Sequence, residues 1–389
     1  MDIGTQMSAG LRLRRVVVTG FRNYAELVWC PEARVQVLWG ANGSGKTNLL
    51  EAISLLAPGR GLRGARLAEL VRRGGDGWAV AARLATPAGE VELGTGTPPG
   101  GPAERRVFRL EGTTPRSQAE VAAVMAAVWL TPQMDRLFQE GASGRRRFLD
   151  RLVFALEPGH AREVAAHDAA MGQRNRLLAE GRADPVWLAG LEESMARHAV
   201  AAAAARLMLV ERLNAVLAAG GAGGFPPARL ELSDPIAARL RGGPALAAED
   251  WLREALAAGR GADARTGSAA LGAHRADLRL ADAATGLEAV LASTGQQKAL
   301  LIGVVLGHAA LLAEARGFAP LLLLDEPAVH LDPALRQALF AALASLPAQV
   351  LLTGTDRETF LPLRGVAEAW RVDAGTLAAD GGFPASSAG

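Results

Sequence analysis

The chain is poor in cysteine, aromatic residues and lysine for its length of 389 residues. Its single cysteine, Cys30, excludes an internal disulfide framework and a zinc site built from several cysteines. Aromatic residues make up 5% of the chain, with one tyrosine, which disfavours a surface built to stack single-stranded bases. The scarcity of cysteine fits a protein of a reducing compartment, and we expect the cytoplasm.

Lysine is the least expected shortage, because the chain has 42 basic residues and 40 of them are arginine. The two lysines are Lys46 and Lys298. A position that keeps lysine in such a chain is one where a compact ammonium serves better than a planar guanidinium. The formal net charge of +2 disfavours a wholly basic nucleic-acid binder but allows local arginine patches. Candidate phosphate contacts, with a solvated surface as the alternative, are residues 145–147 and Arg60, Arg63, Arg66, Arg72 and Arg73.

Targeting and membrane-spanning segments are not evident in the sequence. Residues 1–10 contain no basic segment followed by an apolar one, so we expect no secretory signal. The longest apolar stretch, 299–313, includes two glycines and a histidine and is shorter than the ~20 residues of a membrane span. The sequence therefore predicts no association with a membrane.

Hydrophobic periodicity predicts an α/β unit at each end of the chain, with a largely helical insertion between them. Strands are predicted at 11–19, 35–39, 78–84, 90–93, 229–232, 277–280, 321–324 and 349–353. Helices are predicted at 48–56, throughout most of 117–219, and at 248–258, 295–313 and 333–345, with loops at 220–227 and 259–267. The predicted division is 1–116 and 268–372 for the α/β lobes, 117–267 for the helical arm and 373–389 for a disordered tail.

A complete phosphate-loop motif follows the predicted strand 35–39. The motif G-x-x-x-x-G-K-[ST] is met by Gly40, Ala41, Asn42, Gly43, Ser44, Gly45, Lys46 and Thr47. Backbone amides of such a loop surround the β-phosphate, and the following helix adds its positive end. Lys46 would reach the β- and γ-phosphates, and the Thr47 hydroxyl would bind Mg²⁺. We therefore expect the chain to bind ATP and Mg²⁺.

Two carboxylates end the four-leucine strand 321–324. A hydrophobic strand that ends beside the phosphates would carry one carboxylate for the metal and one to activate water. We assign Asp325 to Mg²⁺ and Glu326, with Lys46, to catalysis. The alternative is a pair of ordinary acidic residues at a strand-to-loop junction.

The segment Ser293–Lys298 opens the helix that precedes this strand. An ordinary helix N-cap is one interpretation. The other is a second phosphate-binding helix end, formed by Ser293, Gly295 and Gln296, that serves the phosphate loop of a partner copy. The order of phosphate loop, Ser-x-Gly-Gln-Gln and Asp-Glu is similar to that of ATP-binding-cassette proteins, whose sites close on dimerisation.

The series of short motifs resembles the RecF family of the ABC/SMC ATPase superfamily over about residues 11–356. The motifs lie at 21–24, 40–47, 61–63, 130–135, 144–150, 173–175, 272–277, 293–298, 325–326 and 331–332. The resemblance implies an α/β fold, namely an ABC-type ATPase head of two lobes with an inserted, mostly helical arm. It also implies that Arg22 and Asn23 approach the nucleotide phosphates, that Gln133 senses the metal and that Asp332 lies at a dimer seam.

The function implied by this resemblance is ATP-dependent DNA binding in recombinational gap repair and replication restart. ATP would join two copies into a homodimer on double-stranded DNA near single-strand gaps. Slow, DNA-stimulated hydrolysis would release them, and with RecR and RecO the protein would help to load RecA.

The chain departs from the family pattern at three positions. Gln133 and Met134 stand in the family's Pro-Glu-Asp segment, Asp325-Glu326 replaces the common Asp-Asp, and Thr355-Asp356 take the place of a switch histidine. Two other functions are alternatives. The ATP-binding subunit of a membrane transporter would have its signature much closer to the phosphate loop, whereas Ser293 lies 246 residues after Thr47. An SMC-like structural clamp would need a longer and less interrupted arm.

Overall fold

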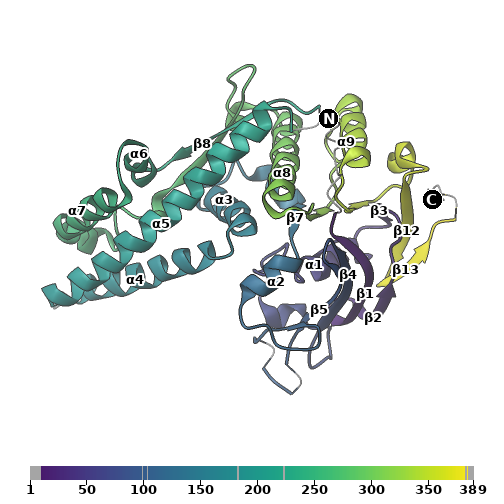
Figure 1. The fold of residues 1–389 in the computed structure, drawn as a ribbon, viewed down its shortest axis with the longest axis horizontal. Helices are drawn as coiled ribbons and strands as arrows, with labels where there is room; N and C mark the ends of the chain where they lie inside the picture. The colour runs from purple at the N-terminus through teal and green to yellow at the C-terminus, as the bar shows by residue number, and fades with distance from the viewer. Residues whose placement is uncertain are drawn as a thin grey trace, which may run out of the picture. The chain divides into compact units, whose positions relative to one another are not determined.

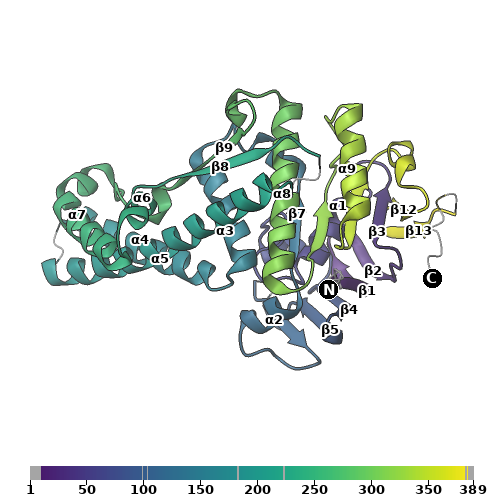
Figure 2. The same cartoon turned by 45° about the horizontal axis from the view of Figure 1, so that its top comes forward.

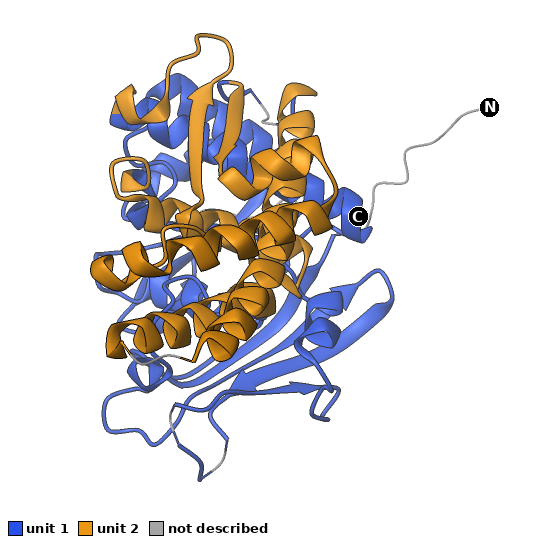
Figure 3. Cartoon of the chain, turned by 90° about the vertical axis from the view of Figure 1, so that its left-hand side faces the viewer, with its two compact units in different colours: residues 1–135, 220–226, 294–389 blue, residues 136–219, 227–293 orange. Residues whose placement is uncertain are grey.

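The computed structural model describes residues 10–98, 100–102, 104–181, 184–221, 224–381 and 383. The chain forms two compact units (Figure 3). Unit 1 comprises residues 1–135, 220–226 and 294–389, and unit 2 comprises residues 136–219 and 227–293. The predicted disordered residues 384–389 lie outside the described part of the chain.

Unit 1 contains an antiparallel sheet and a mostly parallel sheet. The antiparallel sheet has the order β2 (Tyr24–Trp29), β1 (Arg12–Phe21), β4 (Ala79–Thr86), β5 (Gly89–Gly96), β6 (Val107–Leu110). The second sheet has the order β13 (Thr376–Ala379), β12 (Ala367–Asp373), β3 (Val35–Trp39), β11 (Val350–Gly354), β10 (Leu321–Leu324), β7 (Ala127–Leu130). Only β13 is antiparallel to its neighbour in the second sheet. The carboxyl ends of the other five strands therefore share one edge, where ligands of such sheets bind.

The helices of unit 1 are α1 (Lys46–Ser54), α2 (Gln118–Val124), α8 (Thr294–Arg316) and α9 (Pro333–Ser345) (Figures 1 and 2). Short 3₁₀ turns are η1 (Leu67–Leu70), η2 (Pro132–Arg136) and η5 (Glu358–Leu363). α1 contacts both β1 and β11, so it joins the two sheets. The four leucines of β10 are at most 2% exposed, which places this strand in the centre of the core.

α8 is longer than the sequence analysis expected. Its 23 residues are long and apolar enough to cross a membrane by length and composition alone. In the protein, 78% of the most apolar 18 residues of α8 are buried, which is typical of a core helix. The helix predicted at 295–313 begins one residue earlier and ends three residues later.

Unit 2 is built from α3 (Ala142–Leu156), α4 (His160–Glu180), α5 (Pro185–Ala218), α6 (Pro235–Gly242), α7 (Ala245–Thr266) and the hairpin β8 (Ala228–Ser233) and β9 (Asp277–Asp282). The 3₁₀ turns η3 (Ala273–Arg275) and η4 (Ala289–Leu291) flank β9. Its core includes the alanines Ala199, Ala202 and Ala203 of α5, packed with Leu252 of α7. Small side chains on α5 allow neighbouring helices to approach closely, and most of the unit's stability comes from this packing.

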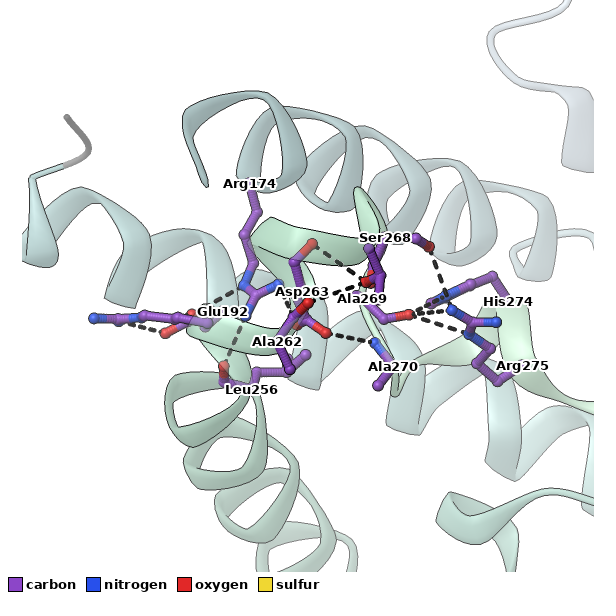
Figure 4. Close-up of polar contacts among 12 residues, drawn as sticks. Arg174, Glu192, Leu256, Ala262, Asp263, Ser268, Ala269, Ala270, His274 and Arg275 are labelled. Carbon is purple, nitrogen blue, oxygen red and sulfur yellow. Dashed lines mark hydrogen bonds and ion pairs between the residues drawn. The ribbon is translucent and has the colours of Figure 1, made fainter. Parts of the chain in front are cut away.

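A buried ionic network joins three helices of unit 2 (Figure 4). Arg174 of α4, which is fully buried, donates to Glu192 of α5 at 2.9 Å and to Asp263 of α7 at 2.8 Å. Its third donor bonds the carbonyl of Leu256 at 2.7 Å. Arg260 also bonds Glu192. Every polar end of Arg174 thus has a partner, as a buried charge requires.

Three sequence-based bounds are corrected by the structure. The arm does not begin at 117, because residues 127–130 form β7 and pair with β10 of unit 1. The second lobe does not begin at 268, because β9 pairs with β8 inside unit 2. The predicted loop 259–267 is helical through Thr266, since Arg260 and Asp263 anchor that part of α7 to the ionic network.

The predicted disordered tail is also wrong for residues 376–379, which form β13. Ala374 and Gly375 have φ of 46° and 85°, and the pairs Asp373–Thr376 and Val372–Leu377 enclose them. Two positive φ values are those of the tight hairpin turn that fits the twist of paired strands. Ala374 and Gly375, two of the small residues that suggested disorder, are therefore the turn of a hairpin.

Candidate nucleotide-binding site

The phosphate loop runs from the end of β3 to the start of α1. Gly43 and Gly45 have φ of 80° and 118°, a region that side chains with a Cβ rarely adopt. A Cβ on Gly45 would lie 2.5 Å from Nδ2 of Asn23. Glycine is therefore required at Gly45 by its backbone conformation and by the close approach of a neighbouring side chain.

Residues of the β1–β2 turn and the β12–β13 turn brace this loop from outside. Asn23 Nδ2 donates to the Ser44 carbonyl at 3.1 Å, and the Tyr24 hydroxyl donates to the Gly45 carbonyl at 3.0 Å. The Gly375 amide also donates to the Ser44 carbonyl, at 3.1 Å. With these carbonyls bonded outward, the loop has a defined shape in which to present its amides to a phosphate.

Lys46 lies at the centre of the loop and is 5% exposed. Its ammonium donates to the carbonyls of Gly40 at 2.7 Å and Ala41 at 3.0 Å and lies 3.8 Å from Glu326 Oε1. Burial lowers the pKa of Lys46, whereas the negative charges of Glu326 and Asp325 oppose this shift. The phosphate loop and the acidic pair, far apart in sequence, thus form one site.

Asp325 joins the ends of three elements. Its Oδ1 accepts from the Thr47 hydroxyl at 2.9 Å and from the Thr353 hydroxyl at 2.7 Å, and the residue is 3% exposed. A carboxylate beside a threonine hydroxyl is a hard oxygen donor set, which suits Mg²⁺ together with water and phosphate oxygens. The predicted pair Thr47 and Asp325 therefore fits this ion. No cluster of three or more His, Cys, Asp or Glu residues suited to a metal is found among the described residues.

Glu326 has an unusual backbone for a residue with a side chain, with φ of 52°. Its amide donates to the Thr353 hydroxyl at 2.9 Å, and its carbonyl accepts from Lys298 at 3.1 Å. Burial raises the pKa of the Glu326 carboxyl; Lys46 and Lys298 oppose the rise, and Asp325 adds to it. A raised pKa brings a carboxylate closer to the basicity that proton abstraction at neutral pH needs.

Comparison with known proteins identifies the family. Residues 12–375 match the family described as the RecF/RecN/SMC N terminal domain. The chain is 47% identical to the DNA replication and repair protein RecF of Mesorhizobium japonicum, over 95% of this chain and 98% of that protein. It is 44% identical to the protein of the same name from Agrobacterium fabrum, over 96% and 100%. The chain belongs to the RecF family.

Solved structures show the same fold. A structure of the recombination mediator protein RecF of the RecFOR pathway, in the form called RecF-ATPrS, superposes with a TM-score of 0.84 at 22% identity and covers 96% of this chain and 100% of its own. An SMC head bound to the C-terminal winged-helix domain of ScpA superposes with a TM-score of 0.53 at 16% identity, covering 95% of this chain and 96% of its own. The predicted α/β head of the ABC type with an inserted, mostly helical part is confirmed.

The signature segment of this RecF-family chain begins α8. Ser293 and Gln296 are exposed, and Gly295 is half-buried. A Cβ on Gly295 would lie 3.0 Å from the His330 carbonyl, so this glycine allows the helix start to approach the loop after β10. Contact of this segment with a partner's nucleotide stays a prediction.

Arg22 and Asn23 lie beside the phosphate loop, but their side chains are bonded to protein groups. The Arg22 guanidinium bonds both oxygens of Glu51, at 3.0 and 3.1 Å, and the Glu69 carbonyl at 2.9 Å. Nucleotide contact by either residue stays a prediction. Gln133 follows β7 and is exposed, and its role with the metal also stays a prediction.

Two of the arginines proposed as phosphate contacts are used inside unit 2. Arg145 forms a two-pronged ion pair with Asp277, at 2.7 and 2.8 Å, and Arg146 donates to the Ala276 carbonyl at 3.1 Å. The ion pair lowers the pKa of Asp277, although burial alone would raise it. Arg147 is exposed, so it is the member of this group that could meet DNA.

Sequence reasoning missed Thr353 and His330. Thr353 bonds both Asp325 and the Glu326 amide, and His330 lines a pocket with Glu326, Thr353 and the Thr355-Asp356 pair. The position of Thr353 at the end of the strand next to β10 was the available signal. The sequence comparison for a switch histidine considered Thr355 and Asp356, which lie after Thr353 in the chain.

Proposed function

We propose that this RecF-family chain is an ATP-dependent DNA-binding protein of recombinational gap repair and replication restart, located in the cytoplasm. The observation that supports this most strongly is the joining of Thr47, Asp325 and Thr353, with Lys46 facing Glu326, at one edge of a parallel sheet. The curated relatives covered almost end to end are named DNA replication and repair proteins.

In this proposal the chain binds ATP through residues 40–47. The loop amides and Lys46 hold the phosphates, and Thr47 and Asp325 hold Mg²⁺. Mg²⁺, when bound, would neutralise phosphate charge and orient the nucleotide. Glu326 accepts a proton from the attacking water. Its raised pKa and its position opposite Lys46 support this role.

The exposed signature supports a homodimer that forms with ATP. Ser293, Gly295 and Gln296 of one copy would contact the nucleotide of the other. Hydrolysis would then release the two copies. We expect this dimer to bind double-stranded DNA at gap junctions and to act with RecR and RecO, and through them on RecA.

A test measures phosphate release and duplex DNA binding together. We expect slow hydrolysis that duplex DNA stimulates. We also expect ATP-dependent binding whose affinity falls linearly with salt on a logarithmic plot, because arginine contacts to phosphate release counterions. Glu326→Gln should lose hydrolysis and keep ATP binding. Glu314→Gln, which changes an exposed carboxylate at the far end of α8, should behave as wild type.

The proposal fails if neither duplex DNA nor a RecR homologue changes the rate of hydrolysis or the fraction of dimer. It also fails if Glu326→Gln hydrolyses ATP at the wild-type rate.

A further inference from the structure

Lys298 is one of the chain's two lysines and lies in the first turns of α8, where it is 1% exposed. A buried ammonium is costly unless ion pairs and hydrogen bonds compensate for its lost hydration. The other lysine, Lys46, belongs to the phosphate loop. The chain has 40 arginines, so a positive charge alone does not explain why a buried lysine ends the segment 293–298.

The ammonium of Lys298 ties α8 to the ends of two adjacent strands. It donates to Asp135 Oδ2 at 3.2 Å and to the Glu326 carbonyl at 3.1 Å. Asp135 lies in η2, after β7, and Glu326 follows β10, the strand paired with β7. One side chain of the signature helix therefore contacts both segments that leave this edge of the sheet.

The contact to Glu326 falls on a strained backbone. A φ of 52° is unfavourable for a residue with a side chain and persists only where its surroundings hold it. Thr353 accepts from the Glu326 amide, and Lys298 donates to the Glu326 carbonyl. Bonds on both sides of Glu326 hold the orientation that places its carboxylate 3.8 Å from Lys46.

We propose that Lys298 is a positioning residue for ATP hydrolysis: its ammonium fixes the backbone of Glu326 from the signature helix, so that the carboxylate stays beside the phosphate loop. This inference rests on the proposed function, in which Glu326 is the base. A simpler structural role is that Lys298 only neutralises the half-buried Asp135. The two roles make different predictions for a variant that lacks both charges.

The decisive variants are Lys298→Met and the double variant Lys298→Met/Asp135→Asn. The double variant has no unpaired charge at this position, so it recovers most of the thermal stability lost in Lys298→Met. Its kcat stays about 10²-fold below wild type, because the Glu326 carboxylate is displaced from the position in which it can accept the proton of the attacking water. The Kd for ATP changes little, since residues 40–47 are intact.

A further measurement separates positioning from stability. Hydrogen exchange of the segment 325–331 becomes faster in the double variant, because the Glu326 carbonyl has lost its bond to Lys298. This readout does not depend on hydrolysis. Leu301→Ala, a core change in the same helix, lowers stability without selectively accelerating exchange in this segment.

The inference is overturned if the double variant regains wild-type kcat, or if its exchange in 325–331 matches that of wild type. Failure of the proposed function looks different: the wild-type protein would then not hydrolyse ATP, or Glu326→Gln would be as active as wild type.

Discussion

Lys46 and Glu326 oppose each other at 3.8 Å inside the same site, and each depends on the other's charge. Burial lowers the pKa of the lysine and raises that of the carboxyl, and in each case the opposite charge of the partner restrains the shift. Lys46 is already largely dehydrated, so its ammonium can pair with a phosphate at little further desolvation cost.

The narrow space around Lys46 predicts that arginine cannot replace it. In Lys46→Arg the charge is kept, yet a planar guanidinium is wider than the ammonium held between the Gly40 and Ala41 carbonyls at 2.7 and 3.0 Å. We expect hydrolysis to be abolished, as measured by phosphate release with saturating ATP. A Lys46→Arg protein with normal turnover would contradict this explanation of why the chain keeps lysine here.

Among single residues, the sequence predicted those that belong to a contiguous motif. It missed those that reach the site only through contacts between segments far apart in the chain. Residues 40–47 form a contiguous motif, and Asp325-Glu326 follow a recognisable strand. Thr353 meets Asp325 only because β11 and β10 pair, and Asn23 meets Ser44 only through the β1–β2 turn. Spacing in sequence carries no direct signal for such contacts, so the bond by which the Asn23 amide braces the loop was not predicted.

Among the elements, strongly patterned segments were predicted well and short or small-residue segments were not. The helix 333–345 and the strand 321–324 match the structure at both ends. β7 is four residues long within a helical region, and its pairing with β10 decides its conformation. α7 continues through Gly259 and Gly261 because its ionic contacts outweigh the roughly 1 kcal/mol that each glycine costs in a helix.

The ionic network of unit 2 predicts how strongly α4, α5 and α7 depend on Arg174. In Arg174→Leu, Asp263 loses its only ion-pair partner among the described residues, while Glu192 keeps Arg260. Removing one partner of a buried pair costs about 3–5 kcal/mol. We expect the free energy of unfolding, measured by chemical denaturation, to fall by that amount.

Two controls test the cause of this loss. The double variant Arg174→Leu/Asp263→Leu should recover part of the stability, since no buried charge is then unpaired. Arg253→Leu removes an exposed ion pair on the same α7 and should cost less than about 1 kcal/mol. An equal loss in Arg174→Leu and Arg253→Leu would show that burial of the network does not matter.

For the whole molecule, a net charge of +2 is consistent with DNA binding that depends on ATP. A chain without a large positive field gains little from nonspecific attraction, so local arginine patches must carry the affinity. Two copies joined by ATP would present such patches twice on one duplex. Binding strengthened by two linked contacts disappears when the copies separate, which makes hydrolysis an effective release step.

Dimerisation is therefore the property that decides the composite-site interpretation. Glu326→Gln should accumulate as a dimer with saturating ATP, because Asp325 and residues 40–47 still bind the nucleotide while the base is absent. Analytical ultracentrifugation with and without ATP measures this directly. Adding Ser293→Arg to Glu326→Gln should leave the protein monomeric and still able to bind ATP, because a large side chain at the exposed Ser293 would block the partner's nucleotide and leave the chain's own phosphate loop intact. If the double variant loses ATP binding, Ser293 serves its own site, and if it dimerises as well as Glu326→Gln, the signature does not face a partner.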